Sequence, residues 1–284
     1  MAQHVRAIKG RIGNIEDIAQ ITRAMHAIAM TKVARMKRRL EQTRPYVEAL
    51  EAFLADAIGR LPADAEPSAL LVESESTTAG VLVLNADRGL CGRYKGDLNR
   101  RADELLAEAG PSARLLAGGE KARLHFERRG IEPLRLYNRL YDTPAYDVAV
   151  RMADDLIELY RTGDVGRIDV IYMRFISDLR QRMVVERFLP VSVEGRTNDA
   201  LSEPGAVEMV DEILPVFLRG RLYRAILETK ASEDAIRRQA MRSATDNAED
   251  LLKSLTRSYN KARQQAITRE IADIIGGAEA LRTT

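Results

Sequence analysis

The sequence contains no tryptophan, and aromatic residues make up only 5% of its 284 residues, whereas charged residues make up 30%. So few large side chains among so many charges favour long helices that pair along narrow seams over one large core. The 44 Lys and Arg residues nearly balance the 42 Asp and Glu residues. This balance argues against a strongly basic nucleic-acid-binding protein.

Cysteine is nearly absent as well. Cys91 is the only one, so it has no partner for an internal disulfide, which is typical of proteins from reducing compartments. No stretch approaches the roughly 18 uninterrupted apolar residues of a membrane-spanning helix. Residues 1–11 are polar and basic, without the apolar region of a secretory signal. We therefore expect any membrane contact to go through a partner.

Proline is missing from Val216 to Leu281, where only Gly220, Gly276 and Gly277 interrupt a strongly helical composition. As one helix this stretch would be about 100 Å long, at 1.5 Å per residue. From residue 241 onward, steps of three and four define a coiled-coil seam of Met241, Ala244, Ala248, Leu251, Leu255, Tyr259, Ala262 and Ala266. Such a helix needs a partner of similar length.

Residues 3–60 provide that partner, because their apolar positions repeat with the same steps. These positions are Ile8, Ile12, Ile15, Ile18 or Ala19, Ile21 or Thr22, Met25, Ile28 or Ala29, Val33, Met36 and Leu40. Pro45 either kinks this helix or begins a second segment at Tyr46. We expect the N- and C-terminal helices to lie antiparallel on each other.

Between these helices, short apolar runs alternate with helical segments. Strands are expected at 80–85, 113–117, 131–137, 169–177 and 183–190, and helices at 95–109, 119–129, 144–161 and 206–214. This order predicts a βαβ-type domain with a largely parallel sheet that ends in a hairpin. The expected parts are an N-terminal coiled-coil helix (1–62), an α/β domain (76–195) and a C-terminal coiled-coil helix (206–284).

The turn after the first strand is the main candidate for chemistry. It consists of Asp87, Arg88, Gly89, Leu90, Cys91 and Gly92. A doubly wound fold binds phosphate at this position. However, the turn matches neither G-x-G-x-x-G nor G-x-x-x-x-G-K-[ST], and its two glycines favour a structural tight turn. A phosphate- or nucleotide-binding enzyme that uses this turn is kept as the alternative function.

A second alternative pairs Cys91 with His125 as nucleophile and base. Nothing in the sequence orients the histidine, and a lone cysteine beside a strand is usually a small buried residue. We therefore predict no catalytic residue, no metal ligand and no cofactor-binding residue.

The strongest polar feature is a basic run in the N-terminal helix. It consists of Lys32, Arg35, Lys37, Arg38, Arg39 and Arg44, opposed only by Glu41. At helical spacing the run wraps around the helix. It is either a solvated surface, a site for nucleic-acid phosphates, or a site for an acidic protein surface. The lack of interleaved aromatic residues argues against nucleic acid.

Four stretches of the chain resemble the γ subunit of F-type ATP synthases. They are ITRAMHAIAMTKV (residues 21–33), DRGLCG (87–92), ATDNA (244–248) and YNKARQQAITRE (259–270). The last motif is long and specific, and the resemblance covers almost the whole chain in the right order. The stretch RYKGD (93–97), which lengthens the turn, and the basic residues before Ser243 depart from the family pattern and suggest a divergent member.

The resemblance implies a central rotor shaft that performs no bond chemistry. Its fold would be an antiparallel coiled coil of long N- and C-terminal helices with an inserted Rossmann-like α/β domain. Its partners would be three α and three β subunits, the ε subunit and the membrane ring of c subunits, with no nucleic acid and with membrane contact only through the c ring. Ion flow, of protons or sodium, would turn the shaft and drive the β sites through states of different nucleotide affinity.

By this resemblance, the contacts with the ring of α and β subunits would come from Met25, Lys32, Arg35, Arg38, Arg39, Arg263, Gln264, Thr268 and Glu270. The sequence lacks the dithiol insertion of plant chloroplast forms and has no transit-like leader. We therefore expect a bacterial protein on the cytoplasmic face of the inner membrane.

Overall fold

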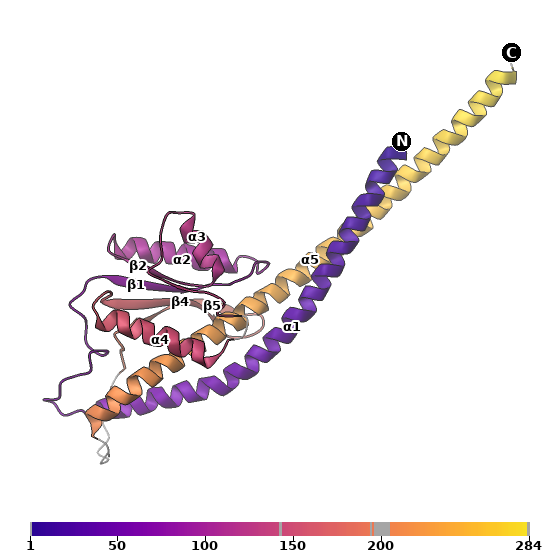
Figure 1. Cartoon of the computed structure of the whole chain (residues 1–284). Coiled ribbons are helices and arrows are strands. Elements are labelled where there is room, and N and C mark those ends of the chain that lie inside the picture. Colours follow the sequence, from indigo (N-terminus) through magenta and orange to yellow (C-terminus); the bar gives the residue numbers. More distant parts are fainter. Residues whose placement is uncertain (1, 142–143, 194, 196–204, 283–284) are drawn as a thin grey trace. The chain divides into compact units, whose positions relative to one another are not determined.

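The computed structural model describes residues 2–141, 144–193, 195 and 205–282 (Figure 1). Its elements are α1 (Ala2–Gly59), β1 (Ala79–Leu84), α2 (Tyr94–Ala109), β2 (Arg114–Gly118), α3 (Glu120–Glu127), β3 (Arg135–Tyr137), α4 (Tyr146–Arg161), β4 (Arg167–Phe175), β5 (Gln181–Leu189) and α5 (Ala206–Arg282). The chain forms two compact units, a terminal unit of Met1–Ala29 and Arg238–Thr284 and a central unit of Met30–Arg237. Both long helices contribute to each unit.

Each long helix continues through a proline. α1 passes Pro45 as a single element, and α5 passes Pro215. The short helix expected at 206–214 is therefore not separate from the long one. A proline inside a helix removes a backbone hydrogen bond, but Leu214 and Phe217 beside Pro215 are buried in the core of the central unit. This packing stabilises the helix across the break.

The five strands form one sheet in the order β3-β2-β1-β4-β5. The first four are parallel, and β5 returns antiparallel to β4, which confirms the predicted sheet with its terminal hairpin. Strand β3 is shorter than expected. Pro133 has no N–H to give to a ladder, and the Ile131 N–H donates to the Phe126 carbonyl oxygen at the end of α3 (3.0 Å).

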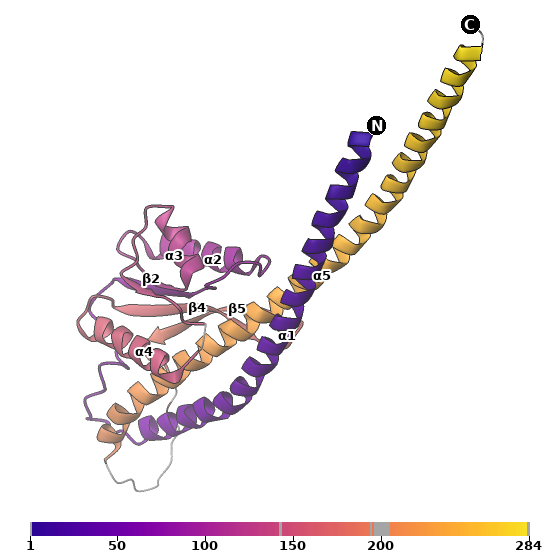
Figure 2. The same cartoon turned by 45° about the vertical axis from the view of Figure 1, so that its right-hand side comes forward.

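Helices cover both faces of the sheet (Figures 1 and 2). Along β1, Val81 and Val83 face α2 and α3, where they pack in one core with Leu98 and Phe126. The alternate residues of β1, Leu82 and Leu84, face a second core built from α4 and from the parts of α1 and α5 in the central unit. A strand buried on both faces explains why this stretch is an uninterrupted apolar run. The observed α/β domain and paired helices confirm the predicted fold class.

The close approach of β1 to the start of α3 generates a prediction about stability. Gly119 has φ 94°, and a Cβ at this position would collide with the Asn85 carbonyl oxygen. We expect Gly119→Ala to lower the free energy of unfolding of the central unit by more than about 2 kcal/mol. Gly96→Ala is the matched control, because its Cβ would meet open space within α2. It should raise stability by roughly 0.5–1 kcal/mol. Equal unfolding midpoints for the two variants in urea would contradict this account.

Candidate functional site

The turn that follows β1 lies at the point where the sheet changes direction. β1 pairs with β2 on one side and with β4 on the other. In doubly wound folds, ligands bind outside the carboxyl ends of the strands at this switch point. The buried Asn85 side chain donates to the Asn99 Oδ1 (2.6 Å) and the Lys95 carbonyl oxygen (3.1 Å). These bonds attach α2 to the end of β1 and fix where the turn begins.

The start of α3 would be the natural position for an anion at this edge of the sheet. A helix N-terminus favours negative charge because its first N–H groups lack partners within the helix. Here a carboxylate of the chain itself takes the position. The Oδ1 of Asp87 accepts a hydrogen bond from the Glu120 N–H (3.1 Å). The turn therefore supplies its own anion where a phosphate would have to bind.

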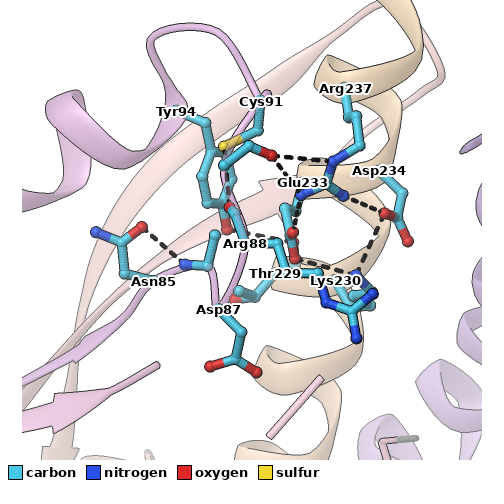
Figure 3. Close-up of polar contacts among 12 residues, drawn as sticks. Asn85, Asp87, Arg88, Cys91, Tyr94, Thr229, Lys230, Glu233, Asp234 and Arg237 are labelled. Atoms are coloured by element: carbon cyan, nitrogen blue, oxygen red, sulfur yellow. Dashed lines mark hydrogen bonds and ion pairs between the residues drawn. The ribbon is translucent and has the colours of Figure 1, made fainter. Parts of the chain in front are cut away.

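Helix α5 contacts the other part of the turn (Figure 3). The Nε and Nη2 of Arg237 donate to the Gly89 carbonyl oxygen (3.3 and 3.2 Å). The hydroxyl of Tyr94 donates to the Thr229 carbonyl oxygen (3.2 Å). Gly92 adopts the left-handed φ of 56°, which supports the structural interpretation of this glycine, whereas a Cβ at Gly89 would meet nothing within 4 Å. Because α5 and Asp87 engage these groups, the geometry argues against the alternative function as a nucleotide-binding enzyme.

Cys91 and His125 have different partners. The Cys91 thiol is buried and lies 3.8 Å from the Arg88 carbonyl oxygen. His125, on α3, pairs its Nε2 with Asp103 Oδ2 (2.9 Å) and packs edge-on against Phe126. Burial, together with the nearby charge of Glu233, raises the pKa of the Cys91 thiol. These features oppose an activated nucleophile, because catalysis needs a thiolate and a base within reach.

The centre of α5 holds a set of charges that the sequence analysis missed. All residues from 225 to 235 are buried, although Glu233 and Asp234 are among them with 1% and 0% exposure. Lys230 Nζ lies 3.2 Å from a carboxylate oxygen of each of these acids. Arg237 contacts both acids as well, with its Nη1 2.6 Å from Asp234 Oδ1. We call Lys230, Glu233, Asp234 and Arg237 the α5 charge cluster.

A second buried carboxylate on α5 binds cations from other elements. Glu228 Oε1 lies 3.0 Å from Arg44 Nη2 of α1, and its Oε2 lies 3.8 Å from Arg174 Nε of β4. Burial raises the pKa of Glu228, and the charge of Arg44 is the largest influence that opposes the rise. Arg44 also donates to the Phe175 carbonyl oxygen (2.6 Å). Glu228 thus connects α5 with both α1 and the sheet.

The structure divides the basic run of α1 into two parts. Arg35, Lys37 and Arg38 are exposed, and Lys32 is half-buried. Arg39 is also half-buried, and its Nη1 donates to the Pro144 carbonyl oxygen (2.7 Å). Arg44 binds Glu228 as described above. Only the first part of the run therefore presents its positive charge outward, while Arg39 and Arg44 have contacts within the central unit.

In the terminal unit, α1 and α5 pack through small residues. Of the alternatives left open by the sequence, Ala19, Thr22 and Ala29 are buried. Thr22 Oγ1 lies 2.8 Å from Thr245 Oγ1 of α5, and Arg23 pairs with Glu249 (2.7 Å) one turn further along. Side chains within residues 5–9 of α1 line a groove together with side chains within residues 259–270 of α5, whereas Thr22 contacts Thr245. Residue numbers therefore rise in opposite directions along the two helices, which are antiparallel as expected.

The larger alternatives of the same pairs face outward. Ile18, Ile21 and Ile28 are 46%, 59% and 57% exposed. On α5, Leu251 was expected in the seam but is 46% exposed, and its neighbour Leu252 is half-buried instead. A thin seam thus brings the two helix backbones close together and leaves branched apolar side chains on the surface.

The candidate contact residues near the C-terminus lie on the surface of the terminal unit. Arg263, Gln264, Thr268 and Glu270 are exposed, and Met25 of α1 is half-buried. Two of these residues, Arg263 and Glu270, line a groove of about 660 Å³. The other lining residues are Val5, Arg6, Lys9, Tyr259, Ala266 and Ile267.

The part of the chain that the structure describes lacks any helix with the length and apolar character needed to cross a membrane. Within the same residues, no three His, Cys, Asp or Glu side chains gather where they could hold a metal ion.

The environment of Cys91 makes its reactivity a test of the site. Because burial raises the thiol pKa, less thiolate is present at pH 8 in the folded chain than in the unfolded chain. We expect a thiol-specific disulfide reagent to label the folded chain at least about 100-fold more slowly than the chain in denaturant. Labelling at the rate of a free cysteine would show an accessible, activated thiol and revive the nucleophile hypothesis.

Comparison with known proteins agrees with the motifs. A family model described as ATP synthase matches residues 4–281. The chain is 38% identical to the ATP synthase gamma chain of Moorella thermoacetica, over 98% of this chain and 99% of the relative. It is 37% identical to the gamma chain of Chloroflexus aurantiacus, over 97% and 98%.

The fold is similar to that of a chain in the Euglena gracilis mitochondrial ATP synthase structure of OSCP, F1 and c-ring. The TM-score is 0.68 at 18% identity, over 99% of this chain and 95% of that one. A chain from the rotor of the same enzyme gives a TM-score of 0.66 at 18% identity, over 94% and 100%. Full-length similarity in both sequence and fold, together with the four motifs, shows that this chain belongs to the ATP synthase gamma chain family.

Proposed function

We propose that the chain is the central rotor shaft of an F-type ATP synthase. It couples the flow of protons or sodium ions through the c ring to conformational cycling of the catalytic β subunits. The proposed partners are three α and three β subunits, the ε subunit and the c ring. The gamma chain family and the rotor and c-ring assemblies named for the similar structures support this assignment.

The observation that carries the proposal is the surface of α1 in the terminal unit. Ile18, Ile21 and Ile28 follow one another at steps of three and seven, so they share one face of the helix. Each is about half exposed, while the smaller Ala19, Thr22 and Ala29 form the seam. Exposed apolar side chains in a row mark a surface that another protein covers. A slender helix pair with such a surface fits inside a closely surrounding ring.

The shaft makes and breaks no covalent bonds in this proposal. It acts by contacting the β subunits differently at each angle, because a partner shifts a conformational equilibrium only through differential contacts. The proposed contact residues are Met25, Lys32, Arg35, Arg38, Arg39, Arg263, Gln264, Thr268 and Glu270. Among them, Arg39 also has a structural role through its bond to Pro144.

The chain is proposed to reside on the cytoplasmic face of a bacterial inner membrane, held there only through the c ring. Its parts would be the N-terminal helix (1–62), the α/β domain (76–195) and the C-terminal helix (206–284). In this arrangement the helices enter the ring of α and β subunits, and the α/β domain lies between that ring and the membrane.

Assembly tests the proposed function directly. Co-expression with the α, β and ε subunits should yield a complex with one copy of this chain for each three αβ pairs. Isothermal titration of the isolated chain with ATP, ADP and phosphate should give no stoichiometric binding, because α5 and Asp87 engage the turn after β1. Hydrolysis of ATP by this chain without α and β would refute the proposal.

The basic run provides a second test. Reversing Arg35 and Arg38 to Glu should weaken ATP-driven ion pumping by the assembled complex, because both side chains present positive charge outward, where an acidic surface of β would meet them. Exposed ion pairs contribute roughly 0.2–1 kcal/mol each, and reversal adds repulsion, so we expect about a tenfold loss at low salt and a smaller loss at high salt.

The control for this double variant is Arg151→Glu, which reverses an exposed arginine of α4. Arg39→Glu should behave differently, because it also removes the bond to the Pro144 carbonyl oxygen and lowers the stability of the isolated chain. Pumping by the Arg35 and Arg38 double variant equal to that of the Arg151 control would disprove the role of this surface.

A further inference from the structure

Three side chains of the long helices donate hydrogen bonds to backbone carbonyl oxygens at one edge of the sheet. Arg44 donates to Phe175 (2.6 Å), Ser232 donates to Met173 (3.0 Å), and Arg237 donates twice to Gly89. The acceptors lie near the carboxyl ends of β4 and β1, which are neighbouring parallel strands. The contacts thus attach α1 and α5 to the edge where a ligand would bind in a doubly wound fold.

The other members of the α5 charge cluster determine the position of the Arg237 guanidinium. Glu233 and Asp234 lie one turn before Arg237 and contact its Nη2 and Nη1, respectively. Lys230 lies one further turn back and contacts both acids. Two cations balance two anions, so no buried net charge remains. The guanidinium group is planar and rigid, so these contacts also fix its Nε and the other hydrogen of Nη2, which both donate to the Gly89 carbonyl oxygen.

Such a contact differs from apolar packing in its dependence on orientation. Apolar burial is non-directional, so one helix can turn against an apolar surface and replace old contacts with similar new ones. A shift of one residue along a helix rotates its side chains by about 100°. For α5, such a rotation would carry the charge cluster along with its internal ion pairs intact, but it would break both hydrogen bonds from Arg237 to the Gly89 carbonyl oxygen. Buried polar groups left without hydrogen-bond partners cost free energy, so the rotation is disfavoured.

We propose that Arg237, Ser232 and Arg44 form a rotational lock that stops α5 and α1 from turning against the sheet. Arg237 is its central residue, and Glu233 and Asp234 are positioning residues that orient it. The mechanical role of the lock rests on the proposed function. In a rotor shaft, torque acts to turn the long helices relative to the α/β domain, which is the motion that these contacts oppose.

The first experiment tests the lock in the isolated full-length chain. Arg237→Met removes both bonds to Gly89, so amide hydrogen exchange in residues 87–96 should become about 10- to 100-fold faster. Exchange in β1 and β2 should stay unchanged. The matched control is Arg151→Met, which breaks an exposed i,i+4 pair with Asp147 on α4. Exchange of residues 87–96 equal to that of the control would overturn the lock.

Arg237→Met also leaves Glu233 and Asp234 with only Lys230 as a cation. The double variant Glu233→Gln and Arg237→Gln avoids this problem, because it removes one charge of each sign. It should still speed up exchange in the turn, since glutamine at position 237 cannot replace the two hydrogen bonds that the arginine Nε and Nη2 donate to the Gly89 carbonyl oxygen. Normal protection of the turn in this double variant would count against the lock even if Arg237→Met fails to fold.

The second experiment measures the largest opposing ion gradient against which the assembled complex can still pump. Complexes with the double variant or with Ser232→Ala should hydrolyse ATP but pump ions against a smaller opposing gradient than complexes with Arg151→Met. Arg237→Lys, which keeps the positive charge but lacks the planar pair of donors, should give a value between those of the double variant and the unchanged chain.

Faster exchange with no decrease in the largest gradient against which the complex pumps would refute the mechanical role and leave the proposed function intact. Failure of the unchanged chain to join α and β subunits would refute the proposed function, while the exchange result would still decide the lock.

Discussion

The burial of α5 between residues 225 and 235 is the constraint on which the central unit depends. A helix that carries four ionisable side chains through a core must provide each charge with a partner, because an uncompensated buried charge is far more costly than a lost apolar contact. Glu228 finds its partners on α1 and β4, and the α5 charge cluster is balanced within itself. The position of α5 under the sheet is therefore specified by polar geometry as well as by packing.

The same constraint explains why a fold associated with nucleotide binding has a different use here. The crevice at the switch point offers backbone groups without partners in the sheet, and in this chain side chains of α5 and the carboxylate of Asp87 satisfy them. Tyr94 adds a bond to the backbone of α5 itself. The edge that would hold a ligand in a related fold instead holds a helix of the same chain.

Periodicity in the sequence predicted the five strands and the long helices in their order along the chain, because strands buried on both faces and long seams leave strong patterns. It wrongly separated residues 206–214 from α5 and made β3 too long. It could not choose between neighbours such as Ile21 and Thr22, since the answer depends on how closely two backbones approach. The α5 charge cluster was missed because charges at steps of three and four are typical of a solvated helix. Its signal was the small residues around it, Ala231, Ser232 and Ala235, which allow a buried helix to pack closely.

The row of isoleucines on α1 also has a consequence for the cell. A chain that displays Ile18, Ile21 and Ile28 to water is, before assembly, a target for chaperones, proteases and self-association. Copies that find no ring would be removed, whereas assembled copies would have this surface covered. Quality control would in this way match the supply of the subunit to the number of rings, without any need for equal rates of synthesis.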